Sequence, residues 1–469
     1  MTAIAIEMSD TGMLAVTDAG GAVGPSPGYA LLDGKRLLVG VEAQARSRLK
    51  PRWIDHRFWD ELDSSPMPKP FPRSLSRADV AHAHLSHLWG RVQQELGATA
   101  ESASVLLAVP GSFSANQLGL ILGIARAAEI PVTGMVDASV AAVAQASGGH
   151  RVLHLDVLLH RMIWTELEGD GELVRRRVEV METGGLARIW DAWAKRIAEL
   201  LVRQTRFDPF HHGSAEQTLY DGLPEWLAEL SRADSVLVTL ESEGKERSVE
   251  LTADGIGPVT SSLTQPVVEV ARVLAGSGVP ATLILSDRAA AIPGLAHELS
   301  QLSQDGVAAL DVGAAARGAL DQRSRIESPG SELPFVIRLP AEVRQGPLSP
   351  ISISPPRSAA PPSSGTSPTH VLCAGLAYPI RDVVLWLGSS VPSSERGLQV
   401  GGPMPGLSRK HCAVYRRDGT VVVEDHSTYG TYLNDRRVEG SVVASAGDRL
   451  RLGSPGIELL LIAVAEDDV

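Results

Sequence analysis

The sequence predicts an α/β domain followed by an all-β sandwich. Strand-like and helix-like segments alternate over most of the chain, whereas short β-branched runs separated by Gly, Asp and Ser dominate its C-terminal part. A Pro- and Ser-rich stretch lies between these two parts and reads as an extended linker. We place the α/β domain at residues 1–321, the linker at 322–368 and the sandwich at 369–469.

Composition narrows the classes of function. The formal net charge of −12 argues against nucleic acid as a partner, because phosphate contacts need clustered Lys and Arg. No apolar run is long enough to span a bilayer, so we expect no membrane partner. The two cysteines, Cys373 and Cys412, do not make a disulfide framework in so long a chain, and a cytoplasmic location is the simplest expectation.

The order of elements in the first domain follows from hydrophobic runs and their breakers. Ile4 and Ile6, together with residues 13–16, predict a hairpin that turns at residues 9–12. A strand is predicted at 104–110, where proline ends an apolar run. Helical and strand patterns then alternate over residues 116–128, 131–137 and 138–145. Residues 333–340 form a strand-like island inside the predicted linker, which we expect to add to one of the domains.

Several short motifs follow one another in the first domain. They are Val109-Pro110 with Ser112-Phe113, the run from Val136 to Ala142, Gly184-Gly185, Arg206-Phe207-Asp208-Pro209, and the run from Val312 to Ala316. In this order they resemble the ATPase domain of the heat-shock-70 chaperone, actin and sugar-kinase superfamily. The resemblance implies an actin-like ATPase fold with two lobes. Another doubly wound α/β domain is the alternative.

The nucleotide-binding motifs of that superfamily are degenerate here. Its phosphate-binding hairpins carry glycines, because only glycine lets backbone N–H groups approach a phosphate closely. The first hairpin instead places the Asp10 carboxylate where a phosphate belongs, and the second keeps Asp156 but has lost its glycines. The adenosine-binding strand should end in two glycines and ends here in Ser286-Asp287-Arg288. The resemblance implies a vestigial nucleotide site made of Asp10, Thr11, Asp156, Gly184 and Gly185.

We therefore expect a domain that has kept the fold and lost efficient hydrolysis, with no catalytic residue and no required cofactor. A divergent ATPase that still binds ATP is the alternative. His154 and His160 flank Asp156, but their spacing along a strand is poor geometry for a metal, so no metal site is expected.

Three ordered motifs mark the C-terminal part. They are Ser408-Arg409-Lys410-His411, the run from Asp425 to Asn434, and the run from Gly447 to Gly453. Together they resemble a forkhead-associated (FHA) domain. The resemblance implies recognition of phosphothreonine peptides by loops at one end of the sandwich. By the family pattern Ser408 bonds the phosphate, Arg409 and Thr428 are neighbouring contact positions, and the buried His411 braces the loops.

Two family residues are missing from this pattern. Ser389 stands where the main phosphate-binding arginine is expected, and Tyr429 replaces the asparagine that holds the peptide backbone. We expect Arg396 or Arg409 to compensate, so the predicted phosphopeptide site comprises Ser408, Arg409, Thr428 and Arg396. A phosphate-independent docking surface is the alternative.

The sequence thus predicts a non-catalytic cytoplasmic adaptor of a bacterial type, whose partner is a protein that carries phosphothreonine. A second hypothesis is an ATP-binding, chaperone-like ATPase that its FHA domain recruits to phosphorylated partners. A third is intramolecular, because a modified Ser349, Ser354 or Thr366 of the linker could dock on the chain's own FHA domain.

Overall fold

The fold is given by a computed structural model. It describes residues 2–144, 151–182, 184–230, 233–242, 244–276, 281–303, 306–328, 333–341, 367–373, 376–392, 395–400, 407–417, 419–434, 436–438, 440–453 and 457–463. The chain divides into two compact units, Met1–Ile353 and Ser354–Val469. The linker residues Ser349, Ser354 and Thr366 lie outside the described residues.

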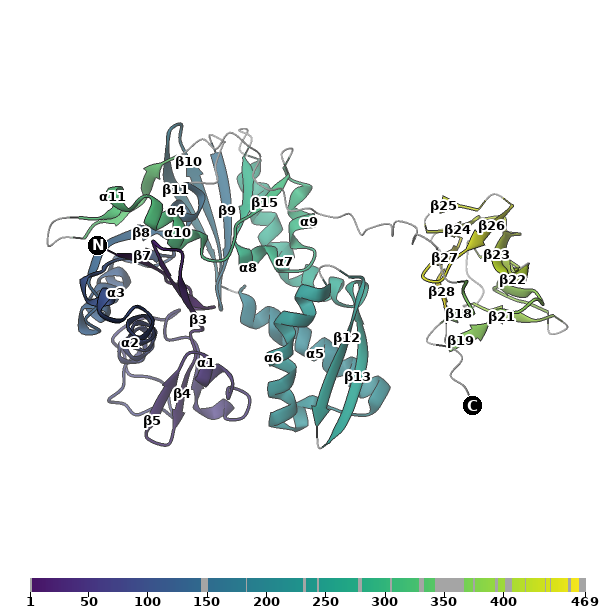
Figure 1. Ribbon diagram of the computed structural model, residues 1–469, viewed down its shortest axis with the longest axis horizontal. Helices are drawn as coiled ribbons and strands as arrows, with labels where there is room; N and C mark the ends of the chain where they lie inside the picture. Colours follow the sequence, from purple (N-terminus) through teal and green to yellow (C-terminus); the bar gives the residue numbers. More distant parts are fainter. Residues whose placement is uncertain are drawn as a thin grey trace. The chain divides into compact units, whose positions relative to one another are not determined.

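Two mixed sheets form the centre of the first unit (Figure 1). The first sheet has the strand order β16-β8-β7-β1-β2-β3, with β1 (Ala3–Glu7), β2 (Met13–Thr17), β3 (Ala22–Ser26), β7 (Ser104–Val109), β8 (Val132–Asp137) and β16 (Phe335–Val336). The second has the order β15-β14-β9-β10-β11-β17, with β9 (Arg151–Val157), β10 (Met162–Glu168), β11 (Glu172–Met181), β14 (Thr282–Leu285), β15 (Val307–Ala309) and β17 (Arg338–Pro340).

The two sheets share one topology. In the first, β1 pairs antiparallel with β2 and parallel with β7, β2 pairs antiparallel with β3, and β7 pairs parallel with β8. In the second, β9 pairs antiparallel with β10 and parallel with β14, β10 pairs antiparallel with β11, and β14 pairs parallel with β15. The second sheet therefore repeats the pairing of the first. The predicted hairpin and the strand–helix alternation of residues 104–144 are confirmed.

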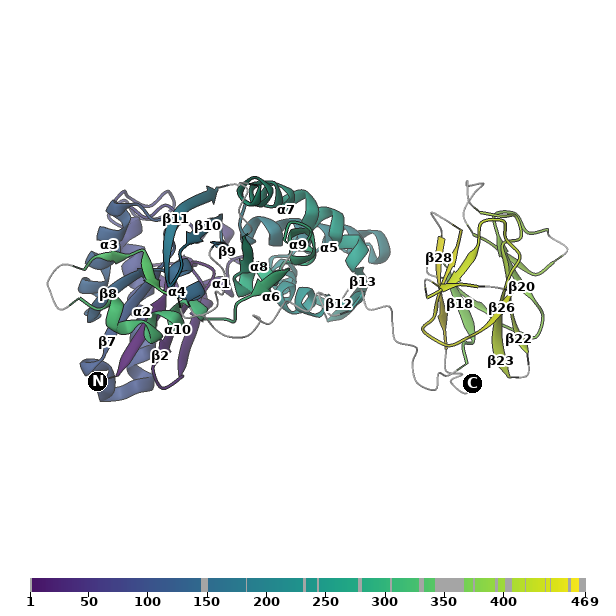
Figure 2. The same ribbon diagram turned by 90° about the horizontal axis from the view of Figure 1, so that it is seen from above.

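Helices cover these sheets and fill the space between them (Figures 1 and 2). The helices are α1 (Val41–Gln44), α2 (Arg77–Leu96), α3 (Ala115–Ala127), α4 (Ala138–Ala144), α5 (Leu186–Thr205), α6 (Gly213–Leu230), α7 (Ala253–Ala275), α8 (Asp287–Ala290), α9 (Leu295–Ser300), α10 (Ala314–Asp321) and α11 (Arg323–Ile326). Short 3-10 helices are η1 (Pro51–Trp53), η2 (Gly97–Ser102) and η3 (Pro209–His211). In the described part of the chain, no helix is both long and apolar enough to cross a bilayer.

The alanine-rich helices α4 and α10 pack between the two sheets. Their buried alanines share one apolar cluster with Leu106 of β7 and Ile284 of β14, one from each sheet. A β-carbon on Gly318 of α10 would lie 1.9 Å from the Ala141 carbonyl oxygen of α4, so the two helices touch through their backbones. Small side chains at these positions therefore set how closely the two sheets approach.

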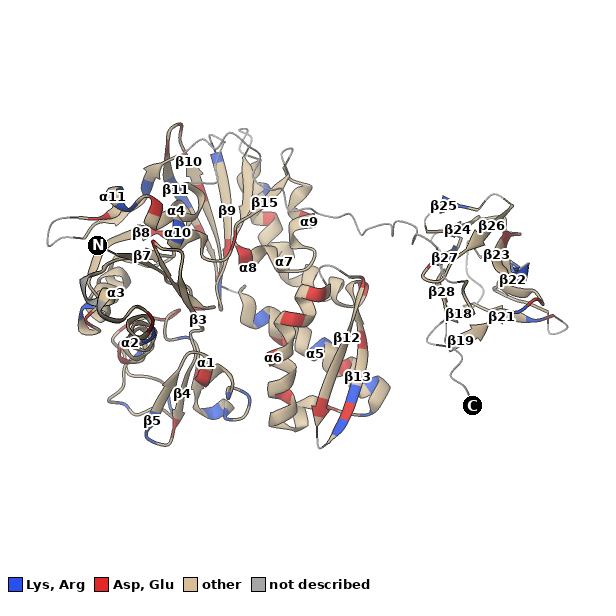
Figure 3. Cartoon of the chain, in the orientation of Figure 1, with Lys and Arg blue, Asp and Glu red and all other residues tan. Residues whose placement is uncertain are grey.

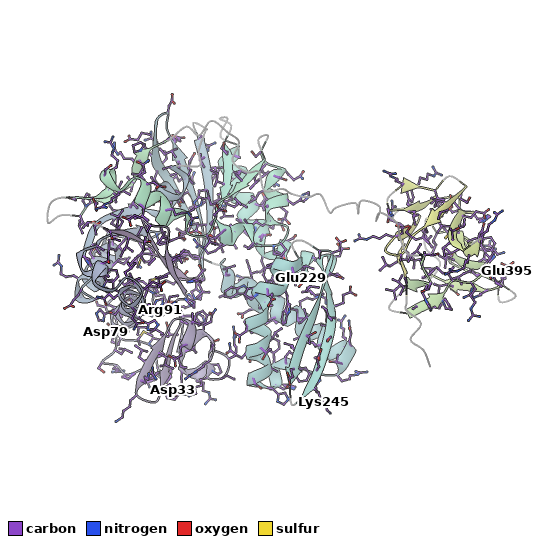
Figure 4. The ribbon with its side chains drawn as sticks, viewed as in Figure 1. Asp33, Asp79, Arg91, Glu229, Lys245 and Glu395 are labelled. Atoms are coloured by element: carbon purple, nitrogen blue, oxygen red, sulfur yellow. The ribbon has the colours of Figure 1, made fainter. Side chains whose placement is uncertain are left out.

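Two smaller sheets extend from this centre. One consists of β4 (Ala30–Asp33), β5 (Arg36–Val39) and β6 (Ile54–Asp55). The other is the hairpin of β12 (Ser235–Ser242) and β13 (Lys245–Thr252), which packs against α5 and α6, and Lys245 lies at its tip (Figure 4). Side chains cap the starts of α2, α3 and α7: at α2, for example, the Ser76 hydroxyl accepts from the Asp79 N–H.

The predicted start of the linker at residue 322 is too early. Helix α11 follows α10 directly, β16 pairs with β8, and β17 pairs with β11, so the island at 333–340 adds a strand to each large sheet. Leu339 is fully buried in the cluster between the sheets. The Pro- and Ser-rich composition placed the predicted domain boundary too early, because the two edge strands are very short and proline flanks them.

The second unit is a sandwich of two antiparallel-rich sheets. One sheet has the order β19-β18-β28-β27-β24-β25, with β18 (His370–Cys373), β19 (Leu376–Pro379), β24 (Thr431–Leu433), β25 (Arg436–Arg437), β27 (Arg449–Leu452) and β28 (Ile457–Ile462). The other has the order β21-β20-β22-β23-β26, with β20 (Leu385–Gly388), β21 (Gly397–Gln399), β22 (Cys412–Arg417), β23 (Thr420–Asp425) and β26 (Ser441–Ala444). Alternate residues of the strands fill one apolar core, as the all-β prediction requires.

Candidate functional site

A buried arginine joins the two large sheets at equivalent strand ends. Arg288, from α8, donates through Nη1 to Glu7 Oε1 at 2.9 Å and through Nη2 to Asp156 Oδ1 at 2.9 Å. Glu7 ends β1 and Asp156 lies near the end of β9, the first strand of each repeated topology. The side chains of all three residues are at least 85% buried. Arg288 is therefore the counterion for two carboxylates that would otherwise be buried without one.

The electrostatics of this cluster are dominated by Arg288. Burial alone would raise the pKa of Asp156, but the charge and hydrogen bond of Arg288, together with smaller effects of His154 and Ser286, outweigh it and hold that pKa below its usual range. Asp287 receives less compensation, so burial raises its pKa. Burial would lower the pKa of Arg288, but the charges of Asp156, Glu7 and Asp287 together raise it.

A small cavity adjoins the arginine. It measures about 20 Å³ and is bordered by Glu7, His154, Asp156 and Arg288, among others. Three buried polar atoms of these residues have no hydrogen-bond partner among the described residues: Glu7 Oε2, His154 Nε2 and Arg288 Nε. Burial holds the pKa of His154 at about 4, so its ring is neutral near pH 7. This volume is enough for one water and far below that of an organic ligand.

The turns that follow β1 and β9 are bonded to each other. The Asp10 carboxylate accepts a hydrogen bond from the Leu159 N–H at 2.8 Å. The Leu158 and Leu159 carbonyls accept from the first amides of α5, Leu186 N–H at 3.0 Å and Ala187 N–H at 2.9 Å. The amides of Leu159, Leu186 and Ala187 are thus already used within the chain and do not face an anion. Burial raises the pKa of Asp10 to about 7.

The predicted vestigial nucleotide residues make different contacts. Asp10 and Gly185 both lie at the β9–β10 turn, whereas Asp156 lies with Arg288. Gly185 has a φ of +101°, and a β-carbon there would lie 2.5 Å from the carbonyl carbon of His160, so this glycine serves close packing. Gly184 packs on Met162, and the Thr11 hydroxyl bonds the Ser9 hydroxyl at 2.6 Å.

Sequence reasoning missed the roles of Arg288 and Glu7. No role was assigned to Glu7 from the sequence, and Arg288 entered only as the end of the Ser286-Asp287-Arg288 run that stands where two glycines are expected. The available signal was charge balance, because two carboxylates at buried strand ends need a cation, and Arg288 lies in the segment that follows the neighbouring strand β14. Among the described residues, no three His, Cys, Asp or Glu side chains form a group that could hold a metal ion.

In the second unit, the structure brings Ser408 and Thr428 together. The Ser408 hydroxyl accepts a hydrogen bond from the Thr428 N–H at 3.2 Å. His411 braces both loops: its Nδ1 accepts from the Ser408 N–H at 3.1 Å, and its Nε2 donates to the Gly430 carbonyl at 3.0 Å. Burial lowers the pKa of His411, so this imidazole is neutral near pH 7. Its predicted bracing position is matched by the geometry.

Exposed side chains border this pair. Thr428 and Arg409 are exposed, and Tyr429 is 51% exposed. Among the described residues the Arg409 guanidinium has no hydrogen-bond or ion-pair partner. The Ser389 N–H donates to the Ser408 carbonyl at 3.0 Å, so position 389 adjoins the site but supplies no cation.

Arg396 lies at the other end of β20. The Arg396 carbonyl accepts from the Trp386 N–H near the start of that strand, while Ser408 lies beside its end. The Arg396 guanidinium donates to the carbonyls of Pro379 and Val383. Lys410, next to Arg409, lies over the Trp386 ring and is paired with Glu395, which Figure 4 labels. Arg409 is therefore the better-placed cation of the two that were predicted.

The second unit is thus a β-sandwich whose loops present Ser, Thr and Arg side chains at one end. Residues 386–453 match the family model of the FHA domain, so this part of the chain is an FHA domain. A search of curated proteins found no match to the chain. No family match covers the first unit, so its resemblance to the heat-shock-70 and actin superfamily stays a prediction from the sequence.

Proposed function

We propose that the chain is a non-catalytic adaptor whose FHA domain binds a threonine-phosphorylated protein. The bond between Ser408 and Thr428, beside the exposed Arg409, carries this proposal. A phosphothreonine offers strong acceptors and about −1.5 to −2 charges, which hydroxyl, backbone and guanidinium donors can bind together. FHA domains are protein-interaction modules, which supports a protein as the partner of this chain.

We propose further that the first unit is an actin-like domain that has lost its nucleotide. The repeated topology of the two sheets, with α4 and α10 between them, supports the actin-like relationship. It is the arrangement expected of a two-lobed fold built from one duplicated unit.

ATP, which this fold family implies, does not fit the residues present. The cavity at the ends of β1 and β9 measures about 20 Å³, and Arg288 fills the space beside it. Glu7, Asp156, Asp287 and Asp311 border it against one arginine, so the negative charges of phosphates would be repelled. The Leu159 amide is occupied by Asp10. We therefore assign no step to a nucleotide.

The alternative, a chaperone-like ATPase recruited by its FHA domain, requires Arg288 to leave both carboxylates. Full-length protein titrated with MgATP tests it, with thermal unfolding and phosphate release as readouts. The proposal expects no thermal shift and no release above background. Turnover that an Asp156→Ala change abolishes would support the alternative and contradict the proposal.

A pull-down tests the adaptor function. Full-length protein should capture partners from a native lysate, and phosphatase treatment of the lysate should remove them. Undiminished capture after treatment would contradict phosphate dependence. The Ser408→Ala variant serves as the binding-site control.

A further inference from the structure

A cationic and aromatic surface lies on the outer face of one FHA sheet. We name Tyr432, Arg437 and Arg451 the arginine–tyrosine ledge. Tyr432 of β24 is paired across the sheet with Arg437 of β25 on one side and with Arg451 of β27 on the other. Residues in such register point to the same face, so the three side chains form one row. The Arg451 guanidinium lies over the Tyr432 ring, 4.1 Å from its centroid.

The ledge lies against the loop of the candidate phosphate site. A β-carbon on Gly430 would lie 3.3 Å from Arg437 Nε and 3.3 Å from Tyr432 Cε2. Gly430 follows Thr428 and Tyr429 directly, and its carbonyl is the one that His411 holds. A peptide bound beside Thr428 would therefore have neighbouring residues within reach of the ledge.

Arg437 has the chemistry to bind a carboxylate. It is exposed, and among the described residues it has no ion-pair partner. Asp435 and Glu439, its acidic neighbours in the sequence, lie outside the described residues. A guanidinium presents a planar fork of donors that matches a carboxylate in two parallel bonds. Figure 3 shows β25, which consists of two arginines, in blue at the edge of its sheet.

We propose that the arginine–tyrosine ledge selects partners with an Asp or Glu close to the phosphothreonine. The inference rests on the proposed function, because it assigns a sequence preference to the same site. An acidic peptide is favoured over nucleic acid because the ledge adjoins a peptide-binding loop and the chain carries a net charge of −12. Arg437 is the residue that contacts the peptide carboxylate. Tyr432 holds Arg451 over its ring, on the side away from Arg437.

The test compares two phosphothreonine peptides that differ only in Asp against Asn at flanking positions. Full-length protein is titrated with each, and with the unphosphorylated acidic peptide. We expect about tenfold tighter binding of the acidic phosphopeptide, the effect of one charge-assisted hydrogen bond. Arg437→Gln should reduce this preference to less than about threefold, while Arg437→Lys should keep part of it.

Arg436→Gln is the matched control. Arg436 is also exposed and carries the same charge, but it is paired with the buried Leu433 and so belongs to the opposite face of the sheet. Its loss should leave the preference unchanged. Equal affinity of the wild type for the two phosphopeptides, or equal effects of the two substitutions, would overturn the inference and leave phosphothreonine binding intact. Binding that ignores the phosphate would overturn the proposed function, and the inference with it.

Discussion

The Asp10 carboxylate accepts a hydrogen bond from the Leu159 N–H at 2.8 Å, which ties the turn after β1 to the turn after β9. Asp10 is almost fully buried, and burial raises its pKa to about 7 from an ordinary 3.8. This contact occupies a backbone amide of the β9–β10 turn with a side chain of the same protein. It gives the first unit a carboxyl group that titrates near neutral pH.

Asp10→Asn should change the pH dependence of stability. Between pH 3.8 and about 7 the folded state keeps a proton on Asp10 that the unfolded state has lost. The wild type therefore loses stability as pH rises through this window, by up to about 1.4 kcal/mol per pH unit. The asparagine variant should lack this loss and gain relative stability toward pH 7.5. Urea unfolding at several pH values measures the difference.

Asp254→Asn is the control for this experiment, because Asp254 is exposed in the first turn of α7. Its difference from the wild type should stay nearly constant between pH 5 and 7.5. A constant difference for Asp10→Asn as well would contradict the raised pKa.

Arg288→Ala should destabilise the first unit by about 3–5 kcal/mol, because it leaves Glu7 and Asp156 buried without a counterion. Arg272→Ala removes an exposed arginine whose ion-pair partner among the described residues is the exposed Glu269, and it should cost within about 0.5 kcal/mol. Denaturant unfolding of both variants makes the comparison. Equal small losses would show that Arg288 is not the counterion that joins the sheets.

Ser389→Arg should tighten phosphopeptide binding about tenfold, because it places a charge-assisted donor beside Ser408. Ser390→Arg adds the same charge at the next, exposed position, where side chains point the other way along an extended chain. Calorimetric titration with a phosphothreonine peptide distinguishes them. The same gain in both variants would indicate general attraction of charge and not a donor within the site.

His411→Ala should loosen both loops of the site, because it orphans the Ser408 N–H and removes the imidazole donor from the Gly430 carbonyl, which keeps the bond from the Gly453 N–H. An orphaned N–H costs about 1–3 kcal/mol. Hydrogen exchange of residues 407–411 and 426–431 should accelerate, and peptide affinity should fall. His426→Ala, which removes a partly exposed ring that packs on Trp386, is the control and should leave the Ser408 amide protected. Unchanged exchange in His411→Ala would contradict the bracing role.

The sequence predicted elements better than it predicted contacts. Apolar runs such as 104–110 and the Gly and Pro breakers located strands and helices, because local hydrophobic periodicity controls them. The pairing of β16 and β17 with strands far away in the chain was not readable, because short edge strands carry little pattern. The same limit applies to Arg288, whose partners are separated from it by long stretches of chain.

In the FHA site, too, the sequence predicted positions along the chain better than side-chain contacts. The ordered motifs located Ser408, Thr428 and His411 correctly beside one another. Arg396 was grouped with them because it is a nearby arginine in the sequence, yet its guanidinium bonds the Pro379 and Val383 carbonyls. The direction of a long side chain depends on tertiary contacts that sequence spacing does not contain.

The central claim is that the FHA domain binds phosphothreonine through Ser408 and Arg409. The most direct measurement is titration of the full-length protein with a phosphothreonine peptide library and with its unphosphorylated twin. We expect the phosphorylated peptides to bind at least about tenfold more tightly than their unphosphorylated twins. Ser408→Ala and Arg409→Ala should each remove most of that difference. Equal binding of both libraries, unchanged in both variants, would contradict it.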